Sequence, residues 1–143
     1  SVLKEQGFKT TVITDNMVAW TISQKKIDLF TSAADTICMD GNIVNKVGTL
    51  QIAILCKHFG IPYFVTGIPD ADKLKKDIVI EERNPNEVLE FNGLKNTLDG
   101  VEAYYPAFDI TPPYLVNGVV TDKKIFSPYN LDEYYKGDVE QYY

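Results

Sequence analysis

Short apolar runs separated by amphipathic stretches make up most of this chain of 143 residues. Runs rich in β-branched and aromatic residues predict strands over 10–14, 27–33 and 61–68. Between the last two runs, apolar residues recur at the spacing of one helical face, at Ile43, Val47, Leu50 and Ile54. We therefore predict a helix that begins near Asn42 and ends at Gly60, a residue type that often terminates helices.

The remaining elements follow from weaker signals. Asp15 is of a type that caps helices, and it predicts a helix over the following residues 17–26. The pair Thr111-Pro112 predicts the start of another helix, because proline suits the first helical position. Further short strands are predicted in the second half of the chain, within 77–85, at 101–105 and at 118–122. The acidic, tyrosine-rich tail over 130–143 predicts a packing segment or a contact with a partner subunit.

Strands that alternate with helices predict an α/β fold, a Rossmann-like parallel twisted sheet flanked by helices. No linker-like or low-complexity segment divides the chain, so we expect one domain over 1–143. Ligands of such sheets bind at the carboxyl ends of the strands. Asp35 follows the predicted strand 27–33, and Asn45 and Lys46 fall in the first turn of the predicted helix. We therefore expect Asp35 and Lys46 to face one crevice.

The composition of the chain argues against some classes of binding partner. The formal net charge is −6 and the pI is about 4.7, which argues against a nucleic-acid partner, because such binding depends on clustered Lys and Arg. No apolar run reaches the roughly 18 residues that a membrane-spanning helix needs, so no membrane partner is expected. Two cysteines, Cys38 and Cys56, make no disulfide framework and favour a reducing compartment, the cytoplasm.

The candidate site has a functional and a structural interpretation. Asp35 is either a general acid or base at a strand end or a residue that caps a turn. A lysine in the first turn of a helix opposes the helix dipole unless it neutralises a bound anion, which favours a phosphate near Asn45 and Lys46. The chain lacks the GxxxxGK[ST] and GxGxxG patterns, so nucleotide binding is not expected.

Other reactive side chains favour structural roles. Cys38 lies three residues after Asp35, and it is either a thiol nucleophile or, as we favour, a small buried apolar residue. Cys56 is expected in the core, and His58, the only histidine, near a helix C-terminus. Asp109 is expected to fix a turn, and the acids of IEER (80–83) to pair with its arginine at the surface. One histidine and scattered acids make no convincing metal site.

Five segments together identify the chain as similar to a known family. They are ITDNMVAW, AADTICMDGNIVNKVGTLQIAILCKHFGIPYFV, IVIEERNPNEV, GLKNTLDGVEAYYPAFDITPPYLVNGVVTD and KIFSP. They resemble methylthioribose-1-phosphate isomerases, in order and over nearly the whole chain. That family is related to ribose-1,5-bisphosphate isomerase and to the regulatory subunits of the translation-initiation guanine-nucleotide exchange factor. The KHFGIPYFV segment favours the methylthioribose branch, and an aspartate at position 35 favours the catalytic members.

The resemblance implies roles for three residues. Asp35 would be the catalytic acid or base, and Asn45 and Lys46 would contact the sugar or the phosphate of the substrate. The implied reaction converts 5-methylthioribose 1-phosphate to 5-methylthioribulose 1-phosphate in methionine salvage, with no metal or organic cofactor. The substrate is a sugar phosphate, and the implied assembly is a homodimer. The alternatives are a ribose-1,5-bisphosphate isomerase and a non-catalytic regulatory or assembly module of the exchange-factor type.

The chain also departs from the family pattern. Family enzymes pair the aspartate with a cysteine on an upstream loop, and an N-terminal helical region supplies arginines; the chain contains neither. Thr36 stands where the family usually has Arg, and Tyr105 where Asn usually precedes PAFD. We expect the chain to be the C-terminal, Rossmann-like part of an isomerase, with little activity by itself. The N-terminal part would precede it or form a separate chain, in the cytoplasm or, in a eukaryote, also in the nucleus.

Overall fold

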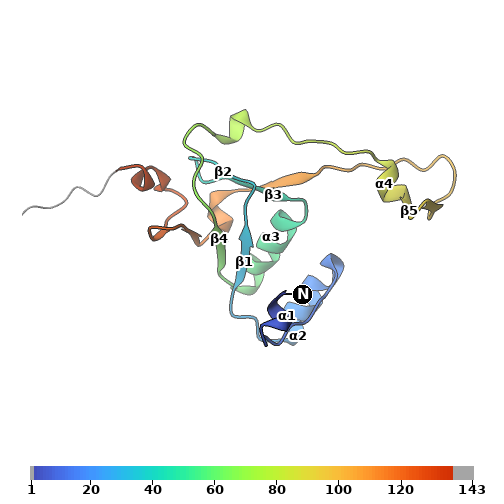
Figure 1. The fold of residues 1–143 in the computed structure, drawn as a ribbon, viewed down its shortest axis with the longest axis horizontal. Coiled ribbons are helices and arrows are strands. Elements are labelled where there is room, and N and C mark those ends of the chain that lie inside the picture. Colours follow the sequence, from blue (N-terminus) through green and yellow to red (C-terminus); the bar gives the residue numbers. More distant parts are fainter. Residues whose placement is uncertain (1, 137–143) are drawn as a thin grey trace, which may run out of the picture.

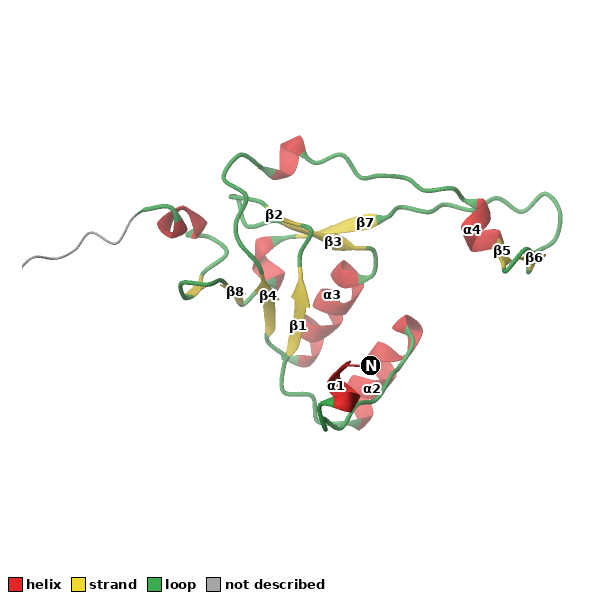
Figure 2. Ribbon diagram, in the orientation of Figure 1, coloured by secondary structure: helices red, strands yellow, loops and turns green. Residues whose placement is uncertain are grey.

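A four-stranded sheet forms the centre of the computed structural model, which describes residues 2–136 (Figures 1 and 2). Its strand order is β1-β4-β8-β9. The first three strands run parallel, β1 (Phe30–Ala33), β4 (Tyr63–Thr66) and β8 (Gly118–Val120), and β9 (Ile125–Phe126) pairs antiparallel to β8 at the edge. The parallel core confirms the α/β prediction, and β1, β4 and β8 lie within three of the predicted strands.

Two helices pack together beside this sheet. The helix α3 (Thr49–Phe59) connects β1 to β4, and its neighbour α2 (Val18–Gln24) follows a 3-10 turn, η1 (Asp15–Met17). As predicted, α3 ends at Gly60, which takes the left-handed conformation with φ 72°. A short helix, α1 (Val2–Glu5), lies near the N-terminus. The core between α3 and the sheet contains Tyr63, Val65, Val119 and Ala53, all without exposed surface.

A second, antiparallel sheet lies at the carboxyl end of β1 and corrects the predicted helix. It has the order β2-β3-β7, from β2 (Thr36–Ile37), β3 (Ile43–Lys46) and β7 (Phe108–Thr111). Residues 43–46 are therefore strand, and the helix begins only at Thr49. The reason is long-range pairing, since β3 pairs with β7 and its first two residues are buried against the core.

Several other predicted elements are wrong. Residues 10–14 and 101–105 belong to no strand, and the only pairing within 77–85 is an isolated bridge between Glu82 and Pro106. Residues 10–14 find no partner strand among the described residues, and Val12 is 88% exposed. Thr111 ends β7, and only a 3-10 turn, η3 (Pro113–Leu115), follows it. Asp15 does not cap α2, because no side-chain hydrogen bond caps η1 or α2.

Residues 78–107, here called the arm, leave the body and return to it (Figures 1 and 2). At the base its two limbs pair through hydrogen bonds from the Arg83 N–H to the Tyr105 carbonyl and from the Ala107 N–H to the Glu81 carbonyl. The tip holds α4 (Asn86–Leu89) and a hairpin of β5 (Glu90–Phe91) and β6 (Leu94–Lys95). Its two turn residues, Asn-Gly, both have positive φ, the type I′ geometry that suits a tight hairpin.

The remaining described segments are short. A 3-10 turn, η2 (Lys75–Asp77), precedes the arm, and another, η4 (Leu131–Tyr134), lies in the tyrosine-rich tail. Tyr134 is buried and its hydroxyl donates to Asp122 Oδ1 at 3.0 Å, which supports a packing role for this part of the tail. Residues 137–143 of the tail lie outside the described residues. In residues 2–136 no helix is both long and apolar enough to cross a membrane.

Candidate active site at the carboxyl end of strand β1

Asp35 lies in a bend directly between β1 and β2. Its backbone N–H donates to the Val44 carbonyl at 3.0 Å, although Val44 is already the register partner of Thr36. Two consecutive residues thus face one residue of the neighbouring strand, as in a β-bulge, a feature that redirects side chains near functional sites. Asp35 is exposed, and no described side chain or backbone group donates to its carboxylate. The carboxylate is therefore free for a ligand.

Asn45 lies on β3, not in a helix, and its side chain is held in place. Its Nδ2 donates to Thr49 Oγ1 at 3.0 Å, and that hydroxyl donates to the Lys46 carbonyl at 2.8 Å. Thr49 is buried at the first position of α3. This contact leaves the amide oxygen of Asn45 without a donor from the described residues, so the oxygen can accept a hydrogen bond from a ligand.

Lys46 is the last residue of β3 and is exposed. Its ammonium lies 4.6 Å from the centroid of the Phe108 ring, and Phe108 is its register partner on β7. Among the described residues no carboxylate forms an ion pair with it. Because successive side chains of a strand point to opposite faces, Asn45 and Lys46 do not share a face. A small ligand that touches both must therefore lie at the end of the strand.

The N-terminus of α3 already holds an anion, the carboxylate of Asp109. Its oxygens accept hydrogen bonds from the Gly48 N–H at 2.7 Å and from the Leu50 N–H at 3.1 Å. Burial raises the pKa of Asp109 above its usual range, while these two hydrogen bonds oppose the increase. Asp109 therefore has the structural role that we expected, but as a helix cap. Its occupancy removes the reason to place a phosphate at this helix end.

The turn between β3 and α3 requires glycine. Gly48 has φ 107°, in the left-handed region, where a residue with a side chain would be strained. Sequence reasoning missed this turn, and it missed the supporting contacts of Asp109 and Thr49. The Val-Gly-Thr sequence before a helical run was the available signal, because glycine and threonine both favour helix N-termini.

The two cysteines are structural in this arrangement. Cys38 has no exposed surface, and burial together with the nearby carboxylates of Asp40, Asp70 and Asp77 raises its pKa to about 11. Such a thiol stays protonated at neutral pH and is a poor nucleophile. Cys56 is also buried, and burial raises its pKa.

Three other predictions concern side chains away from this site. His58 lies in the last turn of α3, as expected. Arg83 and Glu81 form the predicted surface ion pair, with Nε and Oε1 3.3 Å apart. In the described residues no group of three or more His, Cys, Asp or Glu side chains is arranged to hold a metal ion.

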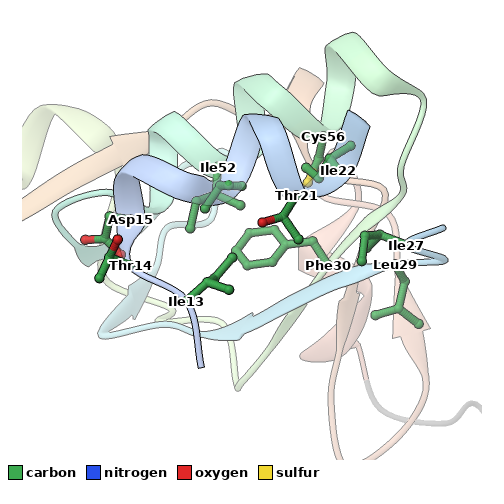
Figure 3. Close-up of a pocket in the computed structure, with 11 residues that line it drawn as sticks. Ile13, Thr14, Asp15, Thr21, Ile22, Ile27, Leu29, Phe30, Ile52 and Cys56 are labelled. Atoms are coloured by element: carbon green, nitrogen blue, oxygen red, sulfur yellow. The ribbon is translucent and has the colours of Figure 1, made fainter. Parts of the chain in front are cut away.

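A cavity of about 310 Å³ lies between α2, α3 and β1 (Figure 3). Its walls are mostly apolar, with Phe30 between Ile13 and Ile52 and with Thr14 and Asp15 at one end (Figure 3). The Phe30 ring stacks on Tyr63, with the ring centroids 4.5 Å apart. None of the three candidate site residues lines this cavity, so it is separate from the candidate site.

A parallel sheet with an acid at the carboxyl end of β1, beside an antiparallel strand that bears an Asn-Lys pair, defines a Rossmann-like α/β protein with a candidate small-molecule site. The chain belongs to the Initiation factor 2 subunit family, which matches residues 1–128. This confirms the resemblance that its sequence segments indicate.

Curated relatives in this family carry isomerase names. The chain is 42% identical over 135 residues to a methylthioribose-1-phosphate isomerase of Bacillus pumilus (strain SAFR-032), which covers 92% of this chain and 38% of that protein. It is 44% identical over 130 residues to a 5-deoxyribose 1-phosphate isomerase of Clostridium botulinum (strain Loch Maree / Type A3), covering 88% and 37%. The chain thus spans less than two-fifths of the length of these relatives.

Solved structures in two functional groups share the fold. The 5-methylthioribose 1-phosphate isomerase of Pyrococcus horikoshii OT3 superposes with a TM-score of 0.84 at 35% identity, over 94% of this chain and 39% of that one. A translation initiation factor eIF-2B subunit delta from A. fulgidus superposes with a TM-score of 0.81 at 33% identity, over 89% and 38%. The fold is therefore common to isomerases and translation-factor subunits.

Proposed function

We propose that this chain carries the C-terminal half of the active site of a sugar-phosphate isomerase, which converts 5-methylthioribose 1-phosphate to 5-methylthioribulose 1-phosphate. The observation that carries the proposal is the exposed, unpaired carboxylate of Asp35 at a bulge beside β3, the strand that bears Asn45 and Lys46. The isomerase names of the relatives support the choice of reaction.

The reaction is an internal redox exchange and needs no external oxidant or reductant. The bond from C1 to the ring oxygen breaks, and that oxygen takes a proton to become the C4 hydroxyl. One hydrogen moves from C2 to C1, as a proton through an enediol or as a hydride, and the C2 hydroxyl becomes a carbonyl. The phosphate stays on C1. Asp35 is proposed to carry a proton in these steps, as general acid at the ring oxygen or as general base near C2.

Asn45 and Lys46 are proposed to hold the substrate at the end of β3. The free amide oxygen of Asn45 can accept a hydrogen bond from a sugar hydroxyl, and its position is fixed by Thr49. The ammonium of Lys46, which has no described carboxylate partner, can neutralise phosphate. Thr36 follows Asp35, but its hydroxyl makes no hydrogen bond to that carboxylate within the described residues, so stabilisation of the carboxylate must come from elsewhere.

The whole protein is proposed to be a cytoplasmic homodimer in which an N-terminal part completes the site. The chain covers only 38% of the Bacillus pumilus relative, so most of that relative has no counterpart in this chain. The family resemblance assigns to that region a cysteine and several arginines. Whether this part precedes the chain or is a separate polypeptide is answered by purifying the protein and sequencing what co-purifies.

A panel of substrates tests the reaction. The full protein is incubated with 5-methylthioribose 1-phosphate, 5-deoxyribose 1-phosphate and ribose 1,5-bisphosphate, and the ketose products are measured by NMR. We expect the highest kcat/KM with 5-methylthioribose 1-phosphate. A clear preference for 5-deoxyribose 1-phosphate, the substrate named for the Clostridium relative, would change the assignment while keeping the reaction type.

A second candidate function is supported by the similarity to the eIF-2B delta subunit. In that case the chain would be a non-catalytic module that binds a partner or a sugar phosphate. The same panel separates the two functions, because a module of this kind would turn over none of the three substrates. Binding of a sugar phosphate without turnover, measured by calorimetry, would support this second function.

A further inference from the structure

Asp15 carries a second free carboxylate near the candidate site. It belongs to the segment ITDNMVAW, to which the proposed reaction assigns no role. An aspartate at this position was expected to cap a helix, but no side-chain hydrogen bond caps η1 or α2. Asp15 is exposed, and within residues 2–136 no group donates to its carboxylate and no Lys or Arg pairs with it. The carboxylate is therefore available to a ligand.

Asp15 lies beside the turn that follows Lys46. Its Oδ2 is 3.7 Å from the position that a Cβ on Gly48 would take. Gly48 is two residues after Lys46, and two residues of extended backbone span at most about 7 Å. Asp35 bonds to β3 at Val44, on the other side of Lys46. Two free carboxylates thus lie near the two ends of the segment that is proposed to hold the substrate.

The apolar cavity between α2, α3 and β1 has Asp15 at one end. Thr14 lies beside it, and the adjoining walls contain Ile13, Ile52 and Phe30 (Figure 3). The volume of about 310 Å³ exceeds the roughly 150 Å³ that holds a benzene molecule, so an apolar group as small as methylthio fits inside. The cavity shares no lining residue with the candidate site, but its polar end adjoins the turn between β3 and α3.

The charges around this cavity disfavour a second phosphate. Of the described residues that line it, Asp15 is the only charged one. The lysines of this region line a different hollow, toward the opposite end of α2; they are Lys9, Lys25 and Lys26. A phosphate at C5 of the sugar would therefore face a carboxylate with no cation to neutralise it, whereas a neutral apolar group would contact apolar walls.

We propose that Asp15 and the cavity behind it form the subsite for the C5 substituent of the substrate and exclude sugars with a second phosphate. With its phosphate on Lys46, a ribose 1-phosphate can reach Asp15 with the other end of the sugar. The carboxylate accepts a hydrogen bond from a sugar hydroxyl, and the methylthio group enters the cavity. The subsite selects ribose 1-phosphates with a neutral, apolar group at C5. This inference rests on the proposed sugar-phosphate function.

Binding of two sugar phosphates to the full protein tests the role of the charge. The dissociation constants of 5-methylthioribose 1-phosphate and ribose 1,5-bisphosphate are measured by calorimetry in an Asp35→Asn background, in which the sugars should bind without reacting. We expect Asp15→Asn to tighten binding of the bisphosphate about 10-fold relative to the methylthio sugar, because the repelling charge is removed. Asp28→Asn changes an exposed aspartate before the opposite end of β1, and this matched control should leave the ratio unchanged.

The size of the cavity is tested through the C5 group itself. Ile13→Phe adds a ring to the cavity wall, and Val12→Phe is its control, because Val12 is 88% exposed and does not line the cavity. We expect Ile13→Phe to weaken binding of 5-methylthioribose 1-phosphate about 10-fold and that of 5-deoxyribose 1-phosphate, whose C5 is a bare methyl group, by less than about 3-fold. Circular dichroism monitors folding, and Val18→Leu, which also changes the cavity wall, replaces Ile13→Phe if its spectrum changes.

The outcomes separate the subsite from the reaction. An unchanged affinity ratio in Asp15→Asn, or equal losses for the two sugars in Ile13→Phe, would overturn the subsite even where the wild type turns over its substrate. The expected shifts without any turnover by the wild type would support the subsite and contradict the isomerase assignment. If none of the sugar phosphates binds, both proposals are wrong.

Discussion

The body of the molecule and its arm differ in the number of buried apolar side chains that hold each in place. The body buries Tyr63, Val65 and Val119 completely between its sheet and α3, whereas no residue from 78 to 106 is buried. Buried apolar contacts define the body from within. The arm has its hairpin turn and a short ladder at its base, and its apolar side chains find no cover in the described chain. The proposed chemistry belongs to the first region.

Two glycines with similar backbone conformations give the largest expected contrast. Gly41 in the body has φ 81° and Gly93 in the arm has φ 76°. A side chain on Gly41 would collide with the Pro128 carbonyl oxygen and lie 2.9 Å from Pro113 Cβ, whereas nothing lies within 4 Å of one on Gly93. We expect Gly41→Ala to lower the unfolding free energy by about 3–5 kcal/mol. Gly93→Ala should lower the unfolding free energy by about 1 kcal/mol, because only the backbone strain of the left-handed conformation opposes it. Urea denaturation measures both, and equal losses would contradict the contrast.

A smaller contrast separates two aspartates. Asp109→Ala removes the carboxylate that accepts from the Gly48 and Leu50 N–H groups, so the N-terminus of α3 loses its cap. We expect the unfolding free energy to fall by about 1–2 kcal/mol. Asp99→Ala in the arm removes only an exposed ion pair with Lys95 and should change it by less than about 0.5 kcal/mol. Thermal melts of both variants test this. A loss of unfolding free energy in Asp99→Ala as large as in Asp109→Ala would show that the arm is held more firmly than we infer.

The pH dependence of Asp109 gives the smallest effect. Burial raises the pKa of this carboxyl above its ordinary value of 3.8 in the folded chain. The protonated carboxyl of Asp109 therefore contributes its full stabilisation below pH 3.8. This stabilisation is lost as the pH rises through the raised pKa of the folded chain. We expect the wild type to exceed Asp109→Asn in unfolding free energy by more at pH 4 than at pH 7. The opposite trend would mean that the helix dipole and hydrogen bonds outweigh burial.

Sequence reasoning succeeded where short-range signals decide the structure. Strand β4 and the helix end at Gly60 follow from apolar runs and from the conformational freedom of glycine. It failed where pairing is long-range. Ile43 and Val47 fit a helical spacing, yet β3 is a strand because it pairs with β7, more than 60 residues away. The apolar residues of 101–105 suggested a strand, but the arm contains no sheet there.

In the candidate site, too, the local placement could be predicted from the sequence and the long-range contacts could not. Asp35 could be placed at a strand exit from its position after an apolar run, and the structure agrees with that placement. The surroundings of Asn45 and Lys46 could not be predicted, because Phe108 and Asp109 come beside them only through the β3–β7 ladder. The predicted placement of Lys46 at a helix N-terminus was wrong, since Lys46 is in a strand and Asp109 occupies that helix end.

Turnover by Asp35→Asn in the full protein tests the central claim most directly. The matched control is Asp28→Asn, an exposed aspartate just before the opposite end of β1. The account predicts that kcat for 5-methylthioribose 1-phosphate falls by about 100-fold or more in Asp35→Asn, that KM changes little, and that the control keeps wild-type kinetics. Wild-type turnover by Asp35→Asn would contradict the assignment of this carboxylate as the acid or base of the reaction.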